Sequence, residues 1–372
     1  MTQDTINRLR LARSDGVGPV TYRRLLGRYG DAEAALAALP ELARAGGRAA
    51  VPHTPSRADA ERELAAAAKL GVQHIYLGTS GYPPLLAELP DAPPVLLVLG
   101  DIALLGARSV AIVGSRSASA NGQRLAETIA GELAQAGIAV VSGMARGIDT
   151  AAHRGALATG RTIACVAGGL DVPYPEENKG LQAEIARNGA VVSEAPLGTA
   201  PLARHFPRRN RLIAGLTLGT VVVEAALRSG SLITARMALE ANREVFAVPG
   251  SPLDPRGRGG NALIRASEAR LVESAQDIIV DLPDGPRIRG LMEPQSVFEA
   301  PPDMPADATE RIFALLGPEP TAVDDLIRRC QLPAATVAAV LLFLEIAGRI
   351  ETLPGNRVAV PAYHIAQTNG SE

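Results

Sequence analysis

The residues best suited to chemistry are concentrated in the segment Arg204-His205-Phe206-Pro207-Arg208-Arg209-Asn210-Arg211, which carries four arginines in eight residues. Arginines can neutralise successive phosphates, an aromatic ring can stack on a base, and an asparagine can hydrogen-bond a base edge or a sugar. This combination indicates a surface that follows a nucleic-acid strand. A solvated basic loop, or pairing of Arg209 and Arg211 with buried acids such as Glu224, explains the same charges, so the segment alone leaves both interpretations open.

Short turns rich in glycine and serine follow a series of β-branched runs. Glycine lets the backbone approach a phosphate closely, and the amides at the start of the next helix point at an anion. Arg116, in the first turn, adds a bidentate phosphate donor. Because ligands bind beyond the carboxyl ends of the strands in a doubly wound sheet, these turns are predicted to form one anion-binding rim. They are Gly114–Arg116, Ser142–Asp149, Gly168–Leu170, Ser193–Glu194, Ser229–Ser231 and Pro249–Gly250.

The nature of the anion is narrowed by motifs that the sequence lacks. No Gly-x-x-x-x-Gly-Lys-Ser/Thr is present, which argues against a P-loop nucleoside triphosphatase. The first strand lacks the Gly-x-Gly-x-x-Gly turn and the second ends in Ser142-Gly143 instead of an acid, which argues against a dinucleotide oxidoreductase. The alternative function is a nucleotide-hydrolysing enzyme resembling the LOG-type phosphoribohydrolases. Their Pro-Gly-Gly-x-Gly-Thr-x-x-Glu signature is reduced here to Gly219-Thr220 and Glu224.

Candidate catalytic side chains are few, and each has a structural explanation. Asp149 and His153 lie one turn apart at a helix start, but we expect Asp149 to cap the helix and His153 to pack in the core. Glu224 ends an apolar strand near the glycine-rich turns and is expected to orient an arginine through a salt bridge. Cys165 lies in an apolar strand where nothing nearby in sequence lowers its pKa, so we expect a core residue. We therefore assign no catalytic residue.

The elements that must position these side chains follow a βαβ rhythm from residue 109 onward. Helical stretches long enough for right-handed crossovers separate the β-branched runs, which predicts an α/β fold with a doubly wound, mainly parallel Rossmann-like sheet. The predicted strands are Ser109–Val113, Ile138–Ser142, Thr162–Ala167, Ala190–Ser193, Thr220–Glu224 and Val245–Val248.

The rest of the chain predicts smaller domains on either side of this sheet. Residues 1–70 are helical in pattern, which indicates a small helix-hairpin-helix or SAM-like domain. Within it, the amides of the Gly16-Val17-Gly18-Pro19 turn, together with Arg23 and Arg24, can grip a phosphate; the alternative is a plain helical hairpin. The further divisions are an extended Rossmann-like domain over residues 71–280, a Pro-rich linker over 281–307 and a winged-helix domain over 308–362.

The winged helix is not expected to read duplex DNA. Residues 306–360 contain more acidic than basic side chains, and the third predicted helix, Ala334–Ala347, is apolar and has no Lys or Arg. A helix that enters a DNA groove needs cations and polar side chains. We therefore expect a structural or protein-contact role for this domain.

The composition of the chain limits the classes of function that it can have. The net charge is −2, so any nucleic-acid site must be a local positive patch. Cys165 and Cys330 lie far apart and no His spacing suits zinc, so neither a metal site, a disulfide framework nor a cofactor is expected. The N-terminus has no apolar signal core and the longest apolar run, Val337–Leu344, is far short of the ~20 residues of a membrane span. We expect a soluble, cytoplasmic protein without membrane association.

An ordered set of segments resembles the DprA (Smf) DNA-processing family. The segments include SVAIVGSRSAS, VVSGMARGIDTAAHRGAL, TIACVAGGLDVPYPEEN, FPRRNRLIAGL and VVVEAALRSGSLITARMALEANREVFAVPG, and they cover roughly residues 108–272. The resemblance implies a protein that binds single-stranded DNA, forms a homodimer and loads the RecA recombinase onto DNA in natural transformation. The implied DNA-binding residues are Gly114, Ser115, Arg116, Gly143, Arg146, Phe206, Arg209, Asn210, Arg211, Ser229, Gly230, Ser231 and Thr234. The chain departs from the family at Ser267-Glu268-Ala269, where a Gly-Ala is expected.

Overall fold

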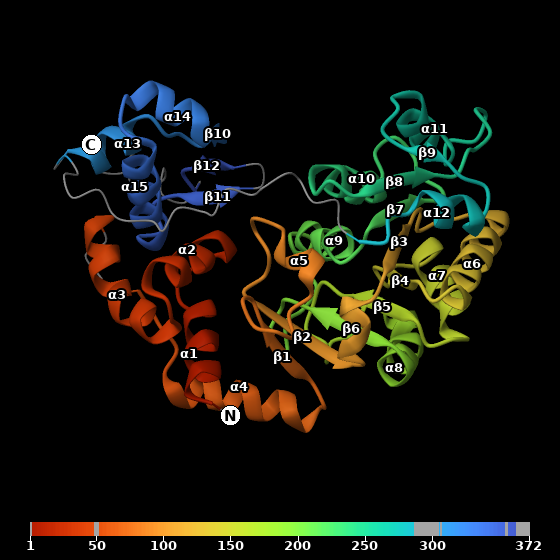
Figure 1. Ribbon diagram of the computed structural model, residues 1–372, viewed down its shortest axis with the longest axis horizontal. Helices are drawn as coiled ribbons and strands as arrows, with labels where there is room; N and C mark the ends of the chain where they lie inside the picture. The colour runs from red at the N-terminus through yellow and green to blue at the C-terminus, as the bar shows by residue number, and fades with distance from the viewer. Residues whose placement is uncertain (1, 48–51, 286–304, 306, 354–355, 362–372) are drawn as a thin grey trace. The chain divides into compact units, whose positions relative to one another are not determined.

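The computed structural model describes residues 2–47, 52–285, 305, 307–353 and 356–361 (Figure 1). The chain divides into two compact units, which are described separately. The sheet unit comprises Leu64–Leu89 and Val95–Arg289, and the helical unit comprises Met1–Glu63, Pro90–Pro94 and Gly290–Glu372.

The sheet unit is built, within the described residues, on a nine-stranded sheet in the order β1-β2-β6-β5-β4-β3-β7-β8-β9. Strands β3 to β9 are parallel, and β1 and β2 add an antiparallel edge beside β6. The strands are β1 (Gln73–Tyr76), β2 (Val95–Gly100), β3 (Ser109–Val113), β4 (Ala139–Ser142), β5 (Thr162–Cys165), β6 (Ala190–Ser193), β7 (Gly219–Val222), β8 (Glu244–Ala247) and β9 (Arg270–Leu271).

The predicted mainly parallel, doubly wound fold is confirmed, and the six predicted strands all occur with small shifts at their ends. They form because β-branched runs are buried on both faces, as parallel strands covered by helices must be. Strands β1, β2 and β9 were not predicted. β1 and β2 precede residue 109, where the predicted βαβ rhythm begins, and β9 is only two residues long.

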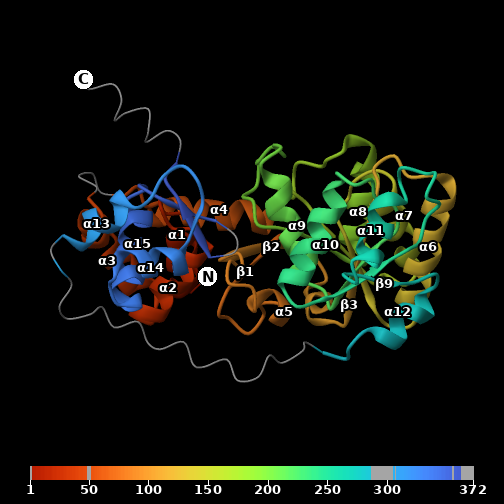
Figure 2. The same cartoon turned by 90° about the horizontal axis from the view of Figure 1, so that it is seen from above.

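Helices cover both faces of this sheet (Figures 1 and 2). One face carries α6 (Ala120–Gln135), α7 (Ile148–Leu157) and α8 (Lys179–Asn188), and α12 (Ala275–Asp281) packs beside α6. The opposite face carries α9 (His205–Gly215) and α10 (Gly230–Glu240). The remaining elements are α5 (Pro84–Ala87), η1 (Ile102–Gly106), η2 (Glu176–Asn178) and α11 (Arg258–Arg265).

The strand order identifies the place where a ligand can bind. From β3 the chain adds β4, β5 and β6 on one side, and then returns to add β7, β8 and β9 on the other. The reversal lies between β3 and β7. Ligands of open α/β sheets bind beyond the carboxyl ends of the strands near such a point, where crossover loops diverge to opposite faces.

The helical unit contains the N-terminal helices and the winged helix. The winged helix is confirmed: β10, β12 and β11 form a small antiparallel sheet beside α13, α14 and α15. Most of the predicted linker, residues 281–307, lies outside the described residues. The elements are α1 (Gln3–Ala12), α2 (Pro19–Tyr29), α3 (Ala32–Ala45), α4 (Arg57–Lys69, which continues into the sheet unit), α13 (Ala308–Ala314), β10 (Thr321–Ala322), α14 (Val323–Cys330), α15 (Ala334–Ile346), β11 (Glu351–Leu353) and β12 (Arg357–Ala359).

Among the described residues, no single helix is long and apolar enough to cross a bilayer. The bent pair of α14 and α15 has sufficient length and apolar composition only when the two helices are taken together.

His153 is a titratable side chain in the core of the sheet unit. Its side chain on α7 is fully buried, with Nδ1 2.7 Å from the Thr162 hydroxyl. The Thr162 hydroxyl donates to the Val140 carbonyl at 3.0 Å, so His153 Nδ1 is the donor to Thr162. Nε2 is buried without a hydrogen-bond partner among the described residues. Burial, with a smaller contribution from the positive charge of Arg209, lowers the pKa of His153 to about 3.

We predict that this histidine makes the sheet unit sensitive to acid. The pKa of His153 is lower in the folded chain than in the unfolded chain. Below about pH 6.5 the unfolded chain therefore binds a proton at His153 that the folded chain does not bind, and the free energy of unfolding decreases. Between pH 7 and pH 5 the loss from this group is about 2 kcal/mol. Urea unfolding measures the free energy of unfolding of the parent and of His153→Asn, which keeps a donor toward Thr162. As the pH is lowered from 7 to 5, this free energy should fall more steeply in the parent. Parallel pH profiles would contradict it.

Candidate nucleic-acid interface

The turns after β3 and β4 pack closely against each other. Gly147 lies between them with φ of +77°, and a Cβ at this position would approach the Ser115 carbonyl oxygen to 2.3 Å. The Ile148 amide donates to the same oxygen at 3.2 Å. Glycine is therefore required at position 147, and the first turn, Gly114–Arg116, is held against the start of α7.

Arg209 ties α9 to the ends of two strands. Its guanidinium, which is buried, donates from Nη1 to the Gly143 carbonyl and, at 3.1 Å, to the Cys165 carbonyl. Its Nε donates to the Asn210 side-chain oxygen at 3.2 Å. One side chain therefore fixes the residues that follow β4 and end β5, which are the residues from which the second and third turns start.

Asp149 supplies the opposite charge beside Arg209. Its carboxylate accepts from the Ala145 amide at 3.2 Å. Burial raises the pKa of Asp149 and the charge of Arg209 opposes this rise, while burial lowers the pKa of Arg209. A Cβ on Gly143 would lie 2.0 Å from Arg209 Nη1 and 2.8 Å from Asp149 Oδ2, so only glycine fits between them.

The expectation that Asp149 caps the helix is wrong. The N-cap residue of α7 is Gly147, without a side-chain cap, and Asp149 lies within the first turn with its carboxylate directed back to the preceding loop. The expectation that His153 and Cys165 belong to the core is confirmed, because both are fully buried and burial raises the pKa of Cys165 to about 12.

The arginine-rich segment is a helix and not a loop. α9 begins at His205, so its arginines point in different directions at 100° per residue. Arg204 and Arg208 are exposed, whereas Arg209 is buried. Arg211 forms an ion pair with Glu194, and not with Glu224. The helix therefore divides one basic segment into exposed cations and structural ones.

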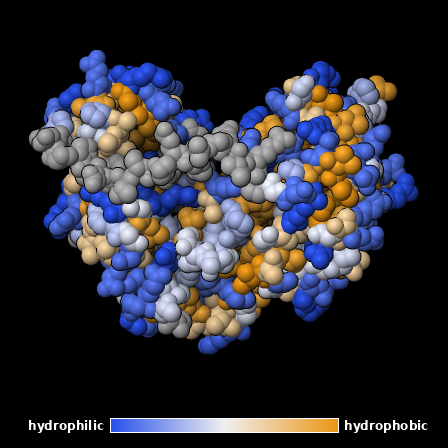
Figure 3. Space-filling view, in the orientation of Figure 1, coloured by the Kyte–Doolittle hydropathy of each residue, from blue (hydrophilic) through white to orange (hydrophobic). Residues whose placement is uncertain are grey.

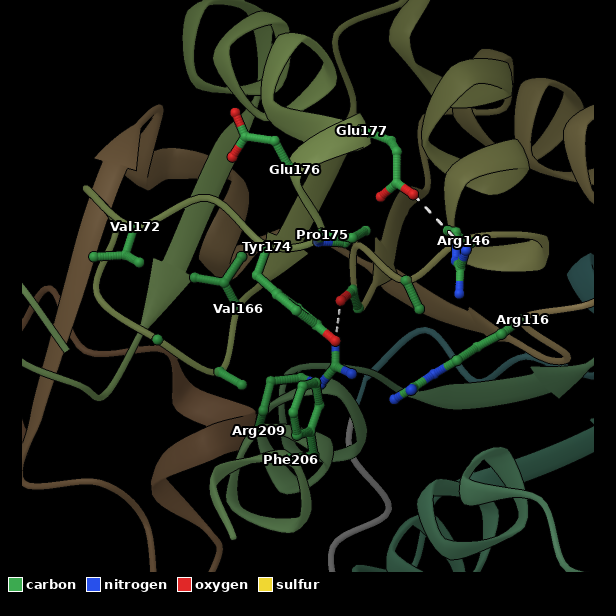
Figure 4. Close-up of a pocket in the computed structure, with 14 residues that line it drawn as sticks. Arg116, Arg146, Val166, Val172, Tyr174, Pro175, Glu176, Glu177, Phe206 and Arg209 are labelled. Carbon is green, nitrogen blue, oxygen red and sulfur yellow. Dashed lines mark hydrogen bonds and ion pairs between the residues drawn. The ribbon is translucent and has the colours of Figure 1, made fainter. Parts of the chain in front are cut away.

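Phe206, in the first turn of α9, lies among aromatic and cationic side chains (Figure 4). Its ring meets that of Tyr174 edge to face, with centroids 5.8 Å apart. The guanidinium carbons of Arg116 and Arg209 lie 5.4 Å and 5.7 Å from the Phe206 ring centroid. Tyr174 is 47% exposed, so this aromatic pair faces solvent.

The aromatic pair borders a pocket of about 250 Å³, which we call the rim pocket. Exposed Arg116 and Arg146 supply positive charge, and Arg146 lies 3.7 Å from Glu177 in an exposed ion pair. The pocket thus combines the positive charges of its arginines, the aromatic surface of the Phe206–Tyr174 pair and the carboxylate acceptors of two glutamates. It is lined by Arg116, Gly143, Ala145, Arg146, Val166, Ala167, Gly168, Val172, Tyr174, Pro175, Glu176, Glu177, Phe206 and Arg209.

The sequence-predicted residues fall into two groups. Arg116, Gly143, Arg146, Phe206 and Arg209 line the rim pocket. The others do not line it: Gly114 and Ser115 shape the first turn, Asn210 and Arg211 bond to Arg209 and Glu194, and Ser229, Gly230, Ser231 and Thr234 start α10, where Ser229 is the N-cap residue.

Tyr174 is the aromatic pocket residue that the sequence reasoning missed, and its neighbours Val172, Pro175, Glu176 and Glu177 were missed with it. The turn at Gly168–Leu170 was identified, but its continuation was not. The available signal was an aromatic residue shortly after a predicted strand in a chain with only 3% aromatic residues.

Glu224 binds a helix start instead of orienting an arginine as expected. Its two carboxylate oxygens accept from the Ser119 hydroxyl at 2.6 Å and the Ser119 amide at 2.9 Å. Ser119 is the N-cap residue of α6, so a carboxylate already occupies the N-terminus of the helix after β3. In dinucleotide-binding sheets this helix start holds the pyrophosphate. Among the described residues, no group of three or more His, Cys, Asp or Glu side chains could hold a metal.

Sequence models of three domains match the chain in order. The domain described as DNA recombination-mediator protein A matches residues 73–283. The DprA-like N-terminal helix-hairpin-helix domain matches residues 2–66, and the DprA winged-helix domain matches residues 296–356.

Related proteins and solved structures agree with these matches. Protein Smf of Escherichia coli is 42% identical over 77% of this chain and 78% of its own length. The X-ray structure of DNA processing protein A from Streptococcus pneumoniae matches with a TM-score of 0.63 and 37% identity, covering 76% of this chain and 99% of that one. The structure of DNA processing protein A from Helicobacter pylori, a protein described by its single-stranded DNA binding mode, matches with a TM-score of 0.51 and 33% identity, covering 56% and 94%.

We predict that Arg209 stabilises the sheet unit. Arg209→Ala leaves two strand-end carbonyls without this donor and Asp149 as an uncompensated buried charge, which costs about 3 to 5 kcal/mol. Urea unfolding followed by circular dichroism measures the loss. Arg208→Ala, one residue earlier but exposed, is the matched control and should change stability by less than about 0.5 kcal/mol. Equal, small effects for both substitutions would show that Arg209 has no such role.

Proposed function

The chain belongs to the DNA recombination-mediator protein A (DprA, Smf) family, and we propose that it binds single-stranded DNA at the rim pocket. The observation that carries the proposal is the solvent-facing Phe206–Tyr174 pair with Arg116 beside it. Bases of a single strand expose their faces and can stack on such rings, whereas bases of a duplex are already stacked on one another.

The charges around the pocket support the same ligand. Arg116 ends the first turn and Arg146 lies within the second, and both are exposed where each can meet a phosphate. Arg204 and Arg208 extend the exposed positive charge along the outer side of α9. Because the whole chain has a net charge of −2, this local concentration directs a polyanion to one edge of the sheet.

We propose a binding function without catalysis. Three acids close to the turns are already engaged: Asp149 with the Ala145 amide and the charge of Arg209, Glu224 with Ser119, and Glu194 with Arg211. Cys165 is buried with its pKa raised to about 12, so its thiolate is not available near neutral pH. Nucleoside monophosphates incubated with the protein should release no base; release would favour the LOG-type alternative.

The family resemblance extends the proposal to a homodimer that loads the RecA recombinase in natural transformation. Leu271 of β9 and Val280 of α12 are large apolar side chains exposed by 51% and 71%, and Figure 3 shows hydrophobic side chains gathered on this side of the sheet unit. They are candidates for burial between two copies. Sedimentation of the parent and of Val280→Asp, and RecA assembly on a strand with and without the protein, test these two steps; a monomeric parent or unchanged RecA assembly would refute the corresponding one.

We predict specific losses of single-strand affinity. Phe206→Ala removes a stacking surface and should weaken binding by about tenfold, whereas Phe206→Tyr should retain it. Arg116→Ala should weaken binding and reduce the slope of log K against log salt by about 0.7 for each phosphate that the protein no longer neutralises. Fluorescence anisotropy of a labelled single strand and of the matched duplex, over a range of salt, measures both effects.

Arg187→Ala is the matched control for charge. Arg187 is exposed at the C-terminal end of α8, which precedes β6 and so lies at the opposite edge of the sheet from the rim pocket. Its loss should leave affinity and salt slope unchanged. Equal binding of strand and duplex, or losses in Arg187→Ala as large as those in Arg116→Ala, would contradict a site at the rim pocket.

A further inference from the structure

The winged-helix helix α15 is buried on more than one side. Val337, Val340, Leu341 and Leu344 belong to the hydrophobic core of the winged helix. Leu342, Phe343, Glu345 and Ile346 are buried as well, but outside that core. Their cover comes from the N-terminal helices, because α15 packs against α2 and α3 (Figure 1).

Two glycines let the backbone of α15 approach the N-terminal helices. Gly16, in the turn between α1 and α2, has φ of +74°, and a Cβ there would lie 2.6 Å from the Ile346 carbonyl oxygen. Gly46, at the end of α3, has an ordinary φ of −79°, yet a Cβ there would lie 2.0 Å from the Phe343 carbonyl oxygen. Both contacts are with main-chain atoms, which cannot rotate away. The last turn of α15 is therefore fitted to this surface.

A buried carboxylate lies at the centre of the contact. Glu345 accepts a hydrogen bond from the hydroxyl of Thr21, in the first turn of α2. Its Oε1 is 3.6 Å from where a Cβ on Gly18 would lie, and Gly18 caps α2 without a side chain. Burial raises the pKa of Glu345, while hydrogen bonds from Thr21 and Thr352 and the positive charge of Arg24 act in the opposite direction.

This carboxylate lies where the hairpin would otherwise meet an external anion. The start of α2 favours negative charge through its orphan amides and helix dipole. The sequence left open whether the Gly16–Gly18 turn grips a phosphate or only connects two helices. In the structure, a carboxylate from another domain of the same chain is placed at that helix start, with Arg24 nearby.

We propose that the Gly16–Gly18 hairpin turn is a docking surface for the winged helix of the same chain, and that Glu345 is the group that selects this pairing. The helices α1–α3 and the winged helix then form one closed module held by α15. As long as α15 is docked, nucleic acid is excluded from the turn. Arg349 adds a second polar contact, because its Nη1 donates to the Gly46 carbonyl at 3.4 Å.

Hydrogen–deuterium exchange on the full chain tests the docking. Gly46→Ala places a methyl group against the Phe343 main chain, and the expected result is exchange faster by about tenfold or more in both residues 334–346 and residues 14–22. Gly27→Ala is the matched control, because Gly27 lies in α2 with nothing within 4 Å of a Cβ. It should leave both segments protected.

Substitutions of Glu345 test its role separately. Glu345→Ala removes the acceptor of Thr21 and should loosen both segments together, whereas Glu345→Gln keeps an acceptor oxygen and should stay closer to the parent. Circular dichroism and single-strand binding at the rim pocket report that each variant remains folded. Unchanged exchange in both Gly46→Ala and Glu345→Ala, or faster exchange in only one of the two segments, would overturn the proposal. So would extra protection of residues 14–22 on adding DNA while α15 keeps its own protection.

Discussion

The sheet unit depends on one buried guanidinium. Arg209 reaches from α9 to the carbonyls of Gly143 and Cys165, so it fixes the ends of β4 and β5 relative to the helix that carries Phe206. Asp149 compensates its charge from the opposite side of Gly143. A buried carbonyl or charge that loses its partner destabilises the fold, so loss of Arg209 is expected to weaken both strand ends and the site of Asp149 together.

This interaction explains how a helix, two turns and an aromatic pair come to share one surface. Burying Arg209 orients α9 so that Phe206 faces Tyr174 and Arg116, while Arg204 and Arg208 stay in solvent. Buried and exposed arginines are therefore neighbours in sequence but separated by helix phase. Glu224, bound at the start of α6, fills the position that would hold a pyrophosphate in a dinucleotide-binding sheet. The exposed edge beside it carries the proposed DNA site.

The sequence predicted the sheet well because strands such as β3 are short runs rich in β-branched residues and followed by glycine-rich turns. It predicted the winged helix from three successive helical patterns followed by a short β-hairpin. The helix α9 was not predicted from the arginine-rich segment, and without helix phase Arg209 could not be distinguished from Arg208. The contact of Tyr174 with Phe206 and the hydrogen bond from Thr21 to Glu345 join residues that are distant in sequence. A local sequence pattern does not predict such contacts.

The most direct measurement is photo-crosslinking of the full chain to a single strand that carries 5-iodouracil, with the attached peptides identified by mass spectrometry. Bases stacked on the rim pocket should crosslink to Phe206 and Tyr174, and excess unlabelled single strand should compete more effectively than duplex. Crosslinks concentrated in the Gly16–Gly18 turn or in α15, with none at these two rings, would contradict the assignment of the rim pocket as the DNA site.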